Sequence, residues 1–364
     1  MSLLYDEGQQ AIANESRRVL DARTDKARLL GLLEQTGAYD SSFWETAKEQ
    51  GWTALALPEE FGGLALGLTE LGIVSHAIGA GTAGAPFLTT GYGAAQAILA
   101  SSDGSVKNEW LPRIASGEAI ATVAFAEEQS PLPTRPTTHL SDGKLTGFKP
   151  GVAGGVQADL AVVLALAEGE PALVLTRLDS SARRPIDSFD NSRGYANLAF
   201  DGAEATLLVK GPAALDKAED ILARMALITA HEQTGGAEAL MHIARDYAVT
   251  RKAFGQPIGA FQSVKHRIAE LYGLVEIARA NCVFAASREG EHDFVVAAAA
   301  ARLSATEAYD TAARDTVQVH GGIGVTWEAG LHLHMRRARS LAIECGNTMF
   351  WEDLLVERLT GVAA

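Results

Sequence analysis

The chain has 364 residues, of which 47% are hydrophobic and 21% charged, so it can bury a large core and is expected to form two or three domains. A net charge of −14 and a pI near 5.1 exclude the strongly basic face that nucleic acid or an anionic membrane requires. The two cysteines, Cys282 and Cys345, exclude a disulfide framework and predict a cytoplasmic protein. The opening MSLLYDEGQQ does not resemble a signal peptide, and no apolar run reaches the ~20 residues of a membrane span.

The hydrophobic periodicity divides the chain into three segments. Residues 1–118 have helical spacing, as in SSFWETAKEQ and LTELGIVSHAIG, and predict an N-terminal α-helical domain. Residues 119–212 contain short β-type runs such as LAVVLALA and ALVLTRL and predict a middle antiparallel β domain. Residues 213–364 form long alanine-rich helical patterns, which predict a C-terminal four-helix bundle. The expected fold class is therefore α+β.

Two motifs in the chain are expected to carry no chemistry. GAGTAG, from Gly79 to Gly84, matches G-x-G-x-x-G, but it follows a helical segment and precedes Pro86, so no strand–turn–helix unit surrounds it. His332 and His334 are two residues apart, which on a helix directs them to different faces and argues against a metal pair.

The stretch RKAFGQPIGAFQSVKH joins two predicted helices. Arg251 ends the first, Phe254 lies in the turn and Gln262 opens the second, so a cation, a flat ring and an amide meet beside a helix N-terminus. That combination indicates a site for an anionic group attached to a flat heterocycle. The alternative is a tight connection in which Arg251 caps carbonyls and Phe254 fills the core.

QVHGGIG ends another long predicted helix and favours the binding interpretation. Gly321 and Gly322 allow backbone N–H groups to approach a phosphate closely, and Gln318 supplies an amide.

These motifs together resemble the acyl-CoA dehydrogenases. The similarity covers nearly the whole chain in family order, through GWTALALPEEFGG, GFKPGVAGGVQADLAVVLA, YAVTRKAFGQPIGAFQSVKHRIAELY and QVHGGIGVTWEAGLHLHMRRA. The last motif resembles a branch that includes steroid-degradation enzymes. The resemblance implies FAD as cofactor, α,β-dehydrogenation of an acyl-CoA thioester, an electron acceptor of the electron-transfer flavoprotein type, and a dimer or tetramer. It also implies that the pyrophosphate and adenosine of FAD would be bound by Arg251, Phe254, Gln262, Gln318, Gly321 and Gly322.

The catalytic base departs from the family pattern. Counting from Gln318 without gaps places Cys345 where most members have a glutamate, and Glu344 is its neighbour. A subgroup takes its base from the preceding long helix, where this chain has Met225. Glu232, two turns further along that helix, is either a displaced base or a buried hydrogen-bond partner. Glu344 and Glu232 are therefore the candidate bases.

The residues expected to contact the flavin ring also differ from the family pattern. Where the family commonly has Thr-Glu-Pro, residues 126–128 read Ala-Glu-Glu, and where it commonly has Trp-Ile-Thr, residues 151–153 read Gly-Val-Ala. An indole and two hydroxyls are thus absent, whereas the adenosine side is intact. In the family the two halves of each FAD site come from different chains.

Three functional hypotheses follow from this asymmetry. The chain is a dehydrogenase component that forms an active site only with a second acyl-CoA dehydrogenase chain, or it is a self-sufficient homo-oligomer with an unconventional base. The third hypothesis is a flavin oxidase or a non-catalytic acyl-CoA- or flavin-binding subunit on the same fold. The small residues of ALITAHEQTGGAEAL either leave room for a bulky acyl group or allow close helix packing.

Overall fold

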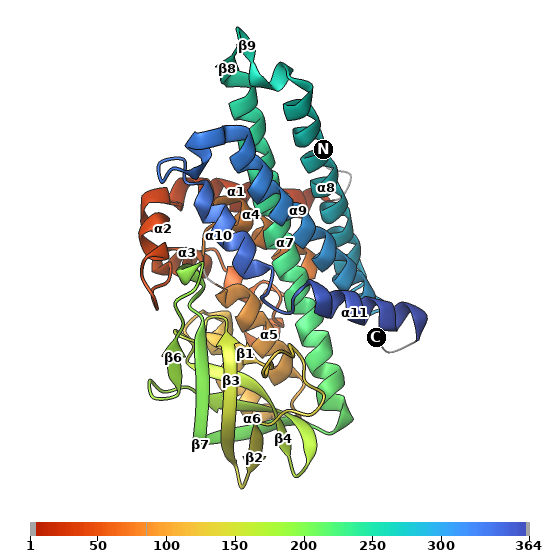
Figure 1. Ribbon diagram of the computed structural model, residues 1–364. Helices are drawn as coiled ribbons and strands as arrows, with labels where there is room; N and C mark the ends of the chain where they lie inside the picture. Colours follow the sequence, from red (N-terminus) through yellow and green to blue (C-terminus); the bar gives the residue numbers. More distant parts are fainter. Residues whose placement is uncertain (1–4, 85, 362–364) are drawn as a thin grey trace. The chain divides into compact units, whose positions relative to one another are not determined.

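The computed structural model describes residues 5–84 and 86–361 and shows an α+β fold with a helical N-terminal part, a middle β domain and a helical C-terminal part (Figure 1). The expected fold class is confirmed. By packing, the described chain forms two compact units. The first comprises residues 1–31, 68–83 and 226–364, and the second comprises residues 32–67 and 84–225. These packing units do not coincide with the three sequence segments, whose boundaries after residues 118 and 212 remain predictions.

The N-terminal part consists of helices and short 3-10 turns joined by loops, between residues 7 and 115. Its elements are α1 (Glu7–Arg23), α2 (Lys26–Leu33), α3 (Ser41–Glu49), η1 (Trp52–Ala54), η2 (Glu59–Phe61), α4 (Leu68–Gly81), α5 (Phe87–Leu99) and α6 (Gly104–Ala115). Aspartates start three of these helices. Asp6 forms a capping box with Gln9, and the Asp40 and Asp103 carboxylates accept backbone N–H bonds at α3 and α6. Local sequence therefore fixes where these helices begin.

Seven strands build the β domain. They are β1 (Ala121–Ala124), β2 (His139–Ser141), β3 (Lys144–Val152), β4 (Leu160–Ala167), β5 (Glu170–Arg177), β6 (Arg183–Pro185) and β7 (Ala196–Lys210). Most pairings are antiparallel, as expected, but β1 and β2 both run parallel to β4. Neither of those two strands is joined to β4 by a short hairpin, so the antiparallel expectation fails for these two pairs.

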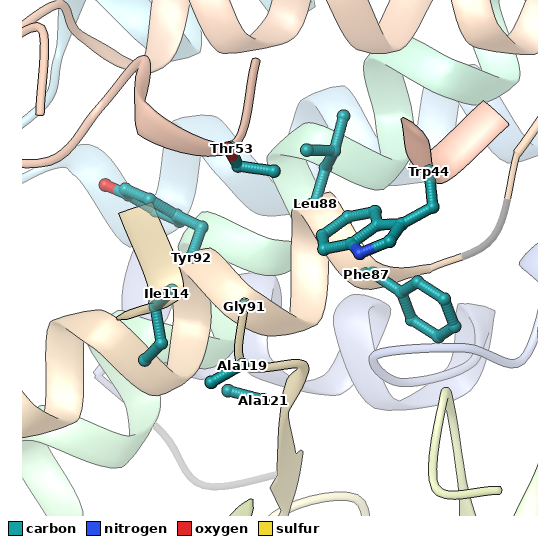
Figure 2. Close-up of a pocket in the computed structure, with 9 residues that line it drawn as sticks. All are labelled: Trp44, Thr53, Phe87, Leu88, Gly91, Tyr92, Ile114, Ala119 and Ala121. Carbon is teal, nitrogen blue, oxygen red and sulfur yellow. The ribbon is translucent and has the colours of Figure 1, made fainter. Parts of the chain in front are cut away.

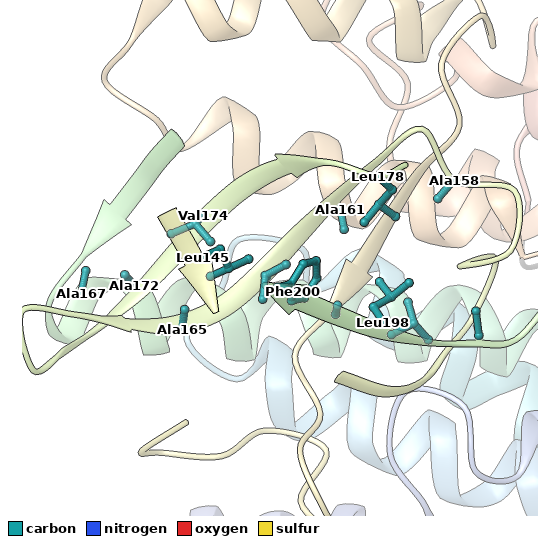
Figure 3. Close-up of a cluster of buried hydrophobic side chains, with 14 residues drawn as sticks. Leu145, Ala158, Ala161, Ala165, Ala167, Ala172, Val174, Leu178, Leu198 and Phe200 are labelled. Atoms are coloured by element: carbon teal, nitrogen blue, oxygen red, sulfur yellow. The ribbon is translucent and has the colours of Figure 1, made fainter. Parts of the chain in front are cut away.

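The sheet closes on itself around an apolar core. Strand β5 pairs with both β4 and β7, so the order β4-β2-β3-β7-β5 returns to its start. Alternate residues of the strands, among them Leu145, Val163, Val174, Leu198 and Phe200, fill the interior (Figure 3). Two-residue loops, Asp142-Gly143 and Glu168-Gly169, turn the β2–β3 and β4–β5 hairpins with both residues at positive φ.

The C-terminal part contains the longest helices. It comprises α7 (Pro212–Thr250), β8 (Lys252–Ala253), β9 (Gln256–Pro257), η4 (Ile258–Ala260), α8 (Gln262–Ser287), α9 (Phe294–His320), η5 (Gly321–Val325), α10 (Leu331–Leu341) and α11 (Thr348–Thr360). Within the first unit, α9 packs against α8, α10 and α11, and side chains of α7 bond to those of α8 and α9. No helix among residues 5–84 and 86–361 is long and apolar enough to cross a membrane.

Glycines let α4 and α7 cross in backbone contact. A Cβ at Gly79 would lie 1.8 Å from the Glu232 carbonyl oxygen, and one at Gly235 would lie 1.9 Å from the His76 carbonyl oxygen. The ring of His231 occupies the space beside Gly72. The small residues of ALITAHEQTGGAEAL therefore serve close helix packing, the second of the two alternatives drawn from the sequence.

Candidate functional site

The junction after α7 is an exposed two-strand hairpin. Strands β8 and β9 pair around Phe254 and Gly255, whose φ angles of 52° and 83° place both in the left-handed region. Such turns favour Asn-Gly or Asp-Gly, because a bulky side chain is strained there. Phe254 is nevertheless 96% exposed. The alternative in which Phe254 fills the core is therefore wrong. Because the backbone of Phe254 is strained and its ring is exposed to solvent, we infer a role for this residue other than stabilising the fold.

Arg251 anchors the hairpin through its backbone alone. Its N–H donates to the Tyr247 carbonyl (2.8 Å) and its carbonyl accepts from the Ile258 N–H (2.8 Å). The side chain is exposed, and over residues 5–84 and 86–361 no hydrogen bond or ion pair involves its guanidinium. Arg251 thus does not cap carbonyls of its own chain. Its charge is available to a ligand.

The end of α9 presents open backbone. Gly321 ends the helix with φ 62° and ψ −142°, a conformation reserved for glycine, and its N–H bonds back to the carbonyls of Val317 and Gln318. A Cβ at Gly321 or Gly322 would meet nothing within 4 Å. Gln318, Gly321 and Gly322 are all exposed. Backbone conformation therefore explains the glycine at 321, whereas neither conformation nor packing explains Gly322.

The ends of α7 and α9 lie together. The ring of Tyr247 stacks on that of His320, with centroids 4.0 Å apart. Ala244, Ala248 and Val319 form a small buried cluster beneath them, on which Ile258, Val264 and Ile268 pack. The structure thus gathers the six predicted cofactor residues at one exposed end of the C-terminal helices. We call Arg251, Phe254, Gln262, Gln318, Gly321 and Gly322 the phosphate-side surface, after the role that the resemblance implies.

We call residues 126–128 and 151–153 the ring-side turns. Glu127 is 6% exposed and its carboxylate accepts from Lys149 Nζ (2.7 Å), from the Thr138 N–H (3.0 Å) and from the hydroxyl of Thr137 (2.8 Å). Burial alone would raise the pKa of Glu127, but these donors outweigh it and lower the pKa to about 2. Lys149 Nζ also donates to the Phe125 carbonyl (3.1 Å). The charged groups here satisfy one another.

The second ring-side turn offers backbone rather than side chains. Gly151 has φ 59°, where an L-residue is strained, and its N–H donates to Asn197 Oδ1 (3.0 Å). The Ala153 carbonyl accepts from the Thr122 hydroxyl (2.7 Å). An aromatic residue in place of Gly151 would be strained at this φ. The phosphate-side surface therefore fits one half of FAD, whereas the ring-side turns supply neither the indole nor the hydroxyls of the family pattern.

Glu232 is committed to a buried ion pair. Its Oε1 accepts from Arg337 Nη1 at 2.6 Å, and the two side chains are 3% and 2% exposed. Arg337 also donates to the Thr82 carbonyl (3.1 Å) and the Ala83 carbonyl (3.3 Å) at the end of α4. This arrangement is that of a buried hydrogen-bond partner, the second of the two roles considered for Glu232.

The turn that carries Glu344 and Cys345 is held by Arg302 of α9. This buried guanidinium donates to the carbonyls of Leu341, Glu344 (2.8 Å) and Gly346 (3.4 Å), and to the side chain of Gln233. Glu344 is 6% exposed. Cys345 has φ 58°, and its Sγ lies 4.0 Å from the Thr229 hydroxyl, one helical turn after Met225. A thiol, rather than a carboxylate, thus lies near α7 at the position that the count from Gln318 assigns to the family base.

Sequence reasoning missed Lys149, Arg302 and Arg337. Arg302 and Lys149 each stood in apolar surroundings, AAAARLSA and LTGFKP, and a long cation inside an apolar run signals a buried ion pair or carbonyl ligand. Arg337 gave no such signal, because it lies in a basic stretch that suggests a solvated face.

The two histidines of α10 contact aromatic side chains of their own chain. His334 is buried, its Nδ1 lies 3.0 Å from the Tyr309 hydroxyl, and burial together with Arg337 lowers its pKa to about 3. His332 stacks on Trp327 with centroids 4.3 Å apart. Among residues 5–84 and 86–361, no cluster of three His, Cys, Asp or Glu side chains could hold a metal ion.

A small apolar pocket in the second unit lies between α3, α5, α6 and β1 (Figure 2). Trp44 and Phe87 meet edge to face at 5.2 Å on one side of it, and Ile114, Ala119 and Ala121 line the other. Its volume of about 10 Å³ is that of a single water, so it cannot hold an acyl chain.

Comparisons with known proteins place the chain in a family. The model of the acyl-CoA dehydrogenase N-terminal domain matches residues 6–118, and that of the C-terminal domain matches residues 215–360. The acyl-CoA dehydrogenase IpdE2 of Mycobacterium tuberculosis is 33% identical over 305 residues, which cover 84% of this chain and 82% of IpdE2. This chain therefore belongs to the acyl-CoA dehydrogenase family.

Two solved structures share the fold over almost the full length. A chain of the ChsE4–ChsE5 complex from Mycobacterium tuberculosis is 25% identical with a TM-score of 0.89, covering 100% of both chains. A glutaryl-CoA dehydrogenase from Mycobacterium smegmatis in complex with FADH2 is 20% identical with a TM-score of 0.89, covering 99% of this chain and 96% of that one.

Proposed function

We propose that this chain is a subunit of a heteromeric acyl-CoA dehydrogenase and supplies the phosphate and adenosine half of an FAD site that a second, related chain completes. The observation that carries the proposal is the contrast between the two halves. The phosphate-side surface is exposed and its cation, Arg251, is engaged by none of the described residues. The carboxylate of the first ring-side turn, Glu127, is instead buried and paired with Lys149.

FAD would accept the β-hydrogen of the acyl-CoA as hydride when bound. The work of this chain is to hold the cofactor. Arg251 would pair with the pyrophosphate, the backbone at Gly322 would approach it closely, and Phe254 would stack on the flat adenine. Gln262 and Gln318 would donate amide hydrogen bonds. Each of these residues is exposed.

The base is expected to come from the partner chain. The family reaction requires a carboxylate that removes the α-proton, and the two positions that supply it in the family hold Cys345 and Met225 here. A free thiol has a pKa of about 8.5 and is mostly protonated at neutral pH, so it is a poor substitute. Glu232 is bound to Arg337. Glu344, next to Cys345, is the remaining carboxylate, and it is the candidate base if the chain acts without a partner.

A related acyl-CoA dehydrogenase chain is the expected partner, and an electron-transfer flavoprotein the expected acceptor. The ChsE4–ChsE5 structure, with which this chain shares its fold over its full length, is a complex of two differently named chains. It supports a heteromer of the same architecture. A structure described as a steroid acyl-CoA dehydrogenase variant is also similar, with a TM-score of 0.86, and supports a bulky acyl-CoA as substrate class.

The deciding experiment measures flavin content with and without the partner. The purified chain alone should show little or no flavin absorbance, and co-expression with a second, related acyl-CoA dehydrogenase chain from the same organism should give a complex with bound FAD that substrate bleaches. A chain that purifies alone with full flavin occupancy and is bleached by acyl-CoA contradicts the heteromer and supports the self-sufficient alternative. In that case Glu344→Gln should abolish bleaching, and Glu232→Gln serves as the comparison.

A further inference from the structure

A second cavity lies within the first unit, among α1, α4, α7 and α8. It has a volume of about 150 Å³. Its apolar wall consists of Ala13, Ile73 and Ala77, and its polar wall consists of Tyr5, Gln10, Arg17, His76, Glu238 and Arg279. None of these residues belongs to the phosphate-side surface or to the turn that carries Glu344, so the proposed function gives the cavity no role.

The acidic group of the cavity is already neutralised. Glu238 accepts from Arg279 Nη2 at 2.6 Å and lies 3.1 Å from His76 Nε2, and all three side chains are at most one-quarter exposed. Burial would raise the pKa of Glu238, but His76 and Arg279 outweigh it and lower the pKa to about 2. Glu238 is therefore an anion paired with Arg279, whose Nη1 also lies 3.3 Å from Glu276 Oε1.

The basic group at the mouth is not neutralised. Arg17 is exposed on α1, and no ion pair within residues 5–84 and 86–361 engages it. Its neighbour Arg18 is instead held by Glu15 at 2.6 Å. Arg279 is engaged by two carboxylates, Glu238 and Glu276, so Arg17 is the cation of the lining that no carboxylate among the described residues engages. Tyr5 adds a hydroxyl donor, since burial raises its pKa to about 12 and keeps it protonated.

Size and polarity together define the class of ligand. A cavity of this volume admits a body about as large as a benzene ring, and the three apolar residues provide a surface for it. The cation of Arg17 and the hydroxyl favour a single negative charge at one end of that body.

We propose that this cavity binds a small monocarboxylate, whose apolar body lies against Ile73, Ala13 and Ala77 and whose carboxylate pairs with Arg17. The site is separate from the proposed FAD site. The inference does not depend on whether the chain dehydrogenates acyl-CoA.

Benzoate is a suitable probe because its ring and single carboxylate match the cavity. Saturation-transfer NMR on the full chain should detect benzoate binding, and titration should give a dissociation constant. Arg17→Ala should raise that constant at least fivefold, and Tyr5→Phe should raise it by a smaller factor. Arg18→Ala is the matched control, since it removes a cation of the same helix that faces Glu15, and it should leave the constant unchanged.

Two further measurements test the charge and the location. Benzylamine, of the same size but opposite charge, should bind at least tenfold more weakly than benzoate. Ala13→Leu should block benzoate by filling the cavity while it leaves Arg17 in place, and FAD titration of the same variant should be unaltered. Equal binding of benzoate and benzylamine, an Arg17→Ala variant that binds as the parent does, or no detectable binding at millimolar benzoate would each overturn the proposal.

Discussion

The phosphate-side surface and the ring-side turns differ in whether their charged side chains are exposed or buried and paired. Arg251 and Phe254 are solvated on a hairpin that packs little of its own side-chain surface, and Phe254 holds a backbone conformation that favours asparagine or glycine. Glu127 and Lys149 are buried, paired and bonded to backbone. The partners of these two buried charges all lie within the β domain, so the second arrangement requires no ligand. The first arrangement is not explained in this way, so the phosphate-side surface is where a ligand or partner chain is expected.

The largest effect should come from breaking the buried pair. Lys149→Met leaves the Glu127 carboxylate buried without its cation, which should lower the free energy of unfolding by about 3–5 kcal/mol. Urea denaturation followed by circular dichroism measures it. The double variant Glu127→Gln/Lys149→Met removes both charges and should recover most of the loss. A single variant as stable as the parent would show that the pair does not hold this domain together.

The same pair predicts a dependence on acid. The folded-state pKa of Glu127, about 2, lies below its usual value of 4.5, so the carboxylate contributes stability above pH 4.5 that is lost as the pH falls towards 2. The stability difference between the parent and Glu127→Gln should therefore be full at pH 7 and shrink below pH 4.5. A difference that stays constant from pH 7 to pH 2.5 would contradict this assignment.

The next effect concerns the exposed cation. Arg251→Ala should weaken FAD retention at least tenfold, because a charge-assisted phosphate contact contributes roughly 1.5–3 kcal/mol. Titration of flavin fluorescence in the reconstituted complex with the partner chain measures it. Lys252→Ala is the control on the same hairpin and should have a smaller effect. Because the Arg251 side chain is exposed and makes no hydrogen bond or ion pair with the described residues, unfolding should be unchanged.

The adjacent glycines separate folding from binding. Gly322→Ala adds a methyl group that meets nothing within 4 Å, so the fold should be unaffected. If the phosphate approaches this backbone, the methyl group should remove one charged hydrogen bond and weaken FAD about tenfold. Gly321→Ala should instead destabilise the chain by about 1–3 kcal/mol, because its ψ of −142° at positive φ suits only glycine. Equal FAD affinity for Gly322→Ala and the parent would place the phosphate elsewhere.

The smallest effect is expected from replacing Phe254, the aromatic residue in the turn of the β8–β9 hairpin. Phe254→Asn suits the left-handed position and should stabilise the chain by a few tenths of a kcal/mol, while it weakens FAD several-fold through the lost ring contact of about 0.5–1.5 kcal/mol. Thermal unfolding and flavin titration report the two effects separately. A variant that loses stability without losing flavin would return Phe254 to a purely structural role.

Much of the architecture was predictable from local patterns. The helical spacing and the β-type runs predicted the order of helical and β segments, because burial of one face sets the period of apolar residues. The motif around Arg251 and the glycines after Gln318 predicted which residues share a surface. They did so because each motif sits at a helix end, and antiparallel helices of similar length bring such ends together.

Only the tertiary structure decided how the buried charges pair. Glu232 and Arg337 are separated by 105 residues, and Gln233 and Arg302 by 69, so no periodicity relates them. The parallel pairing of β1 and β2 with β4 is equally non-local. The sequence by itself determined the elements and the exposed motifs at the helix ends, since these depend on neighbours in the chain. Which carboxylates are locked in ion pairs depends on contacts that exist only once distant segments are packed and water is excluded.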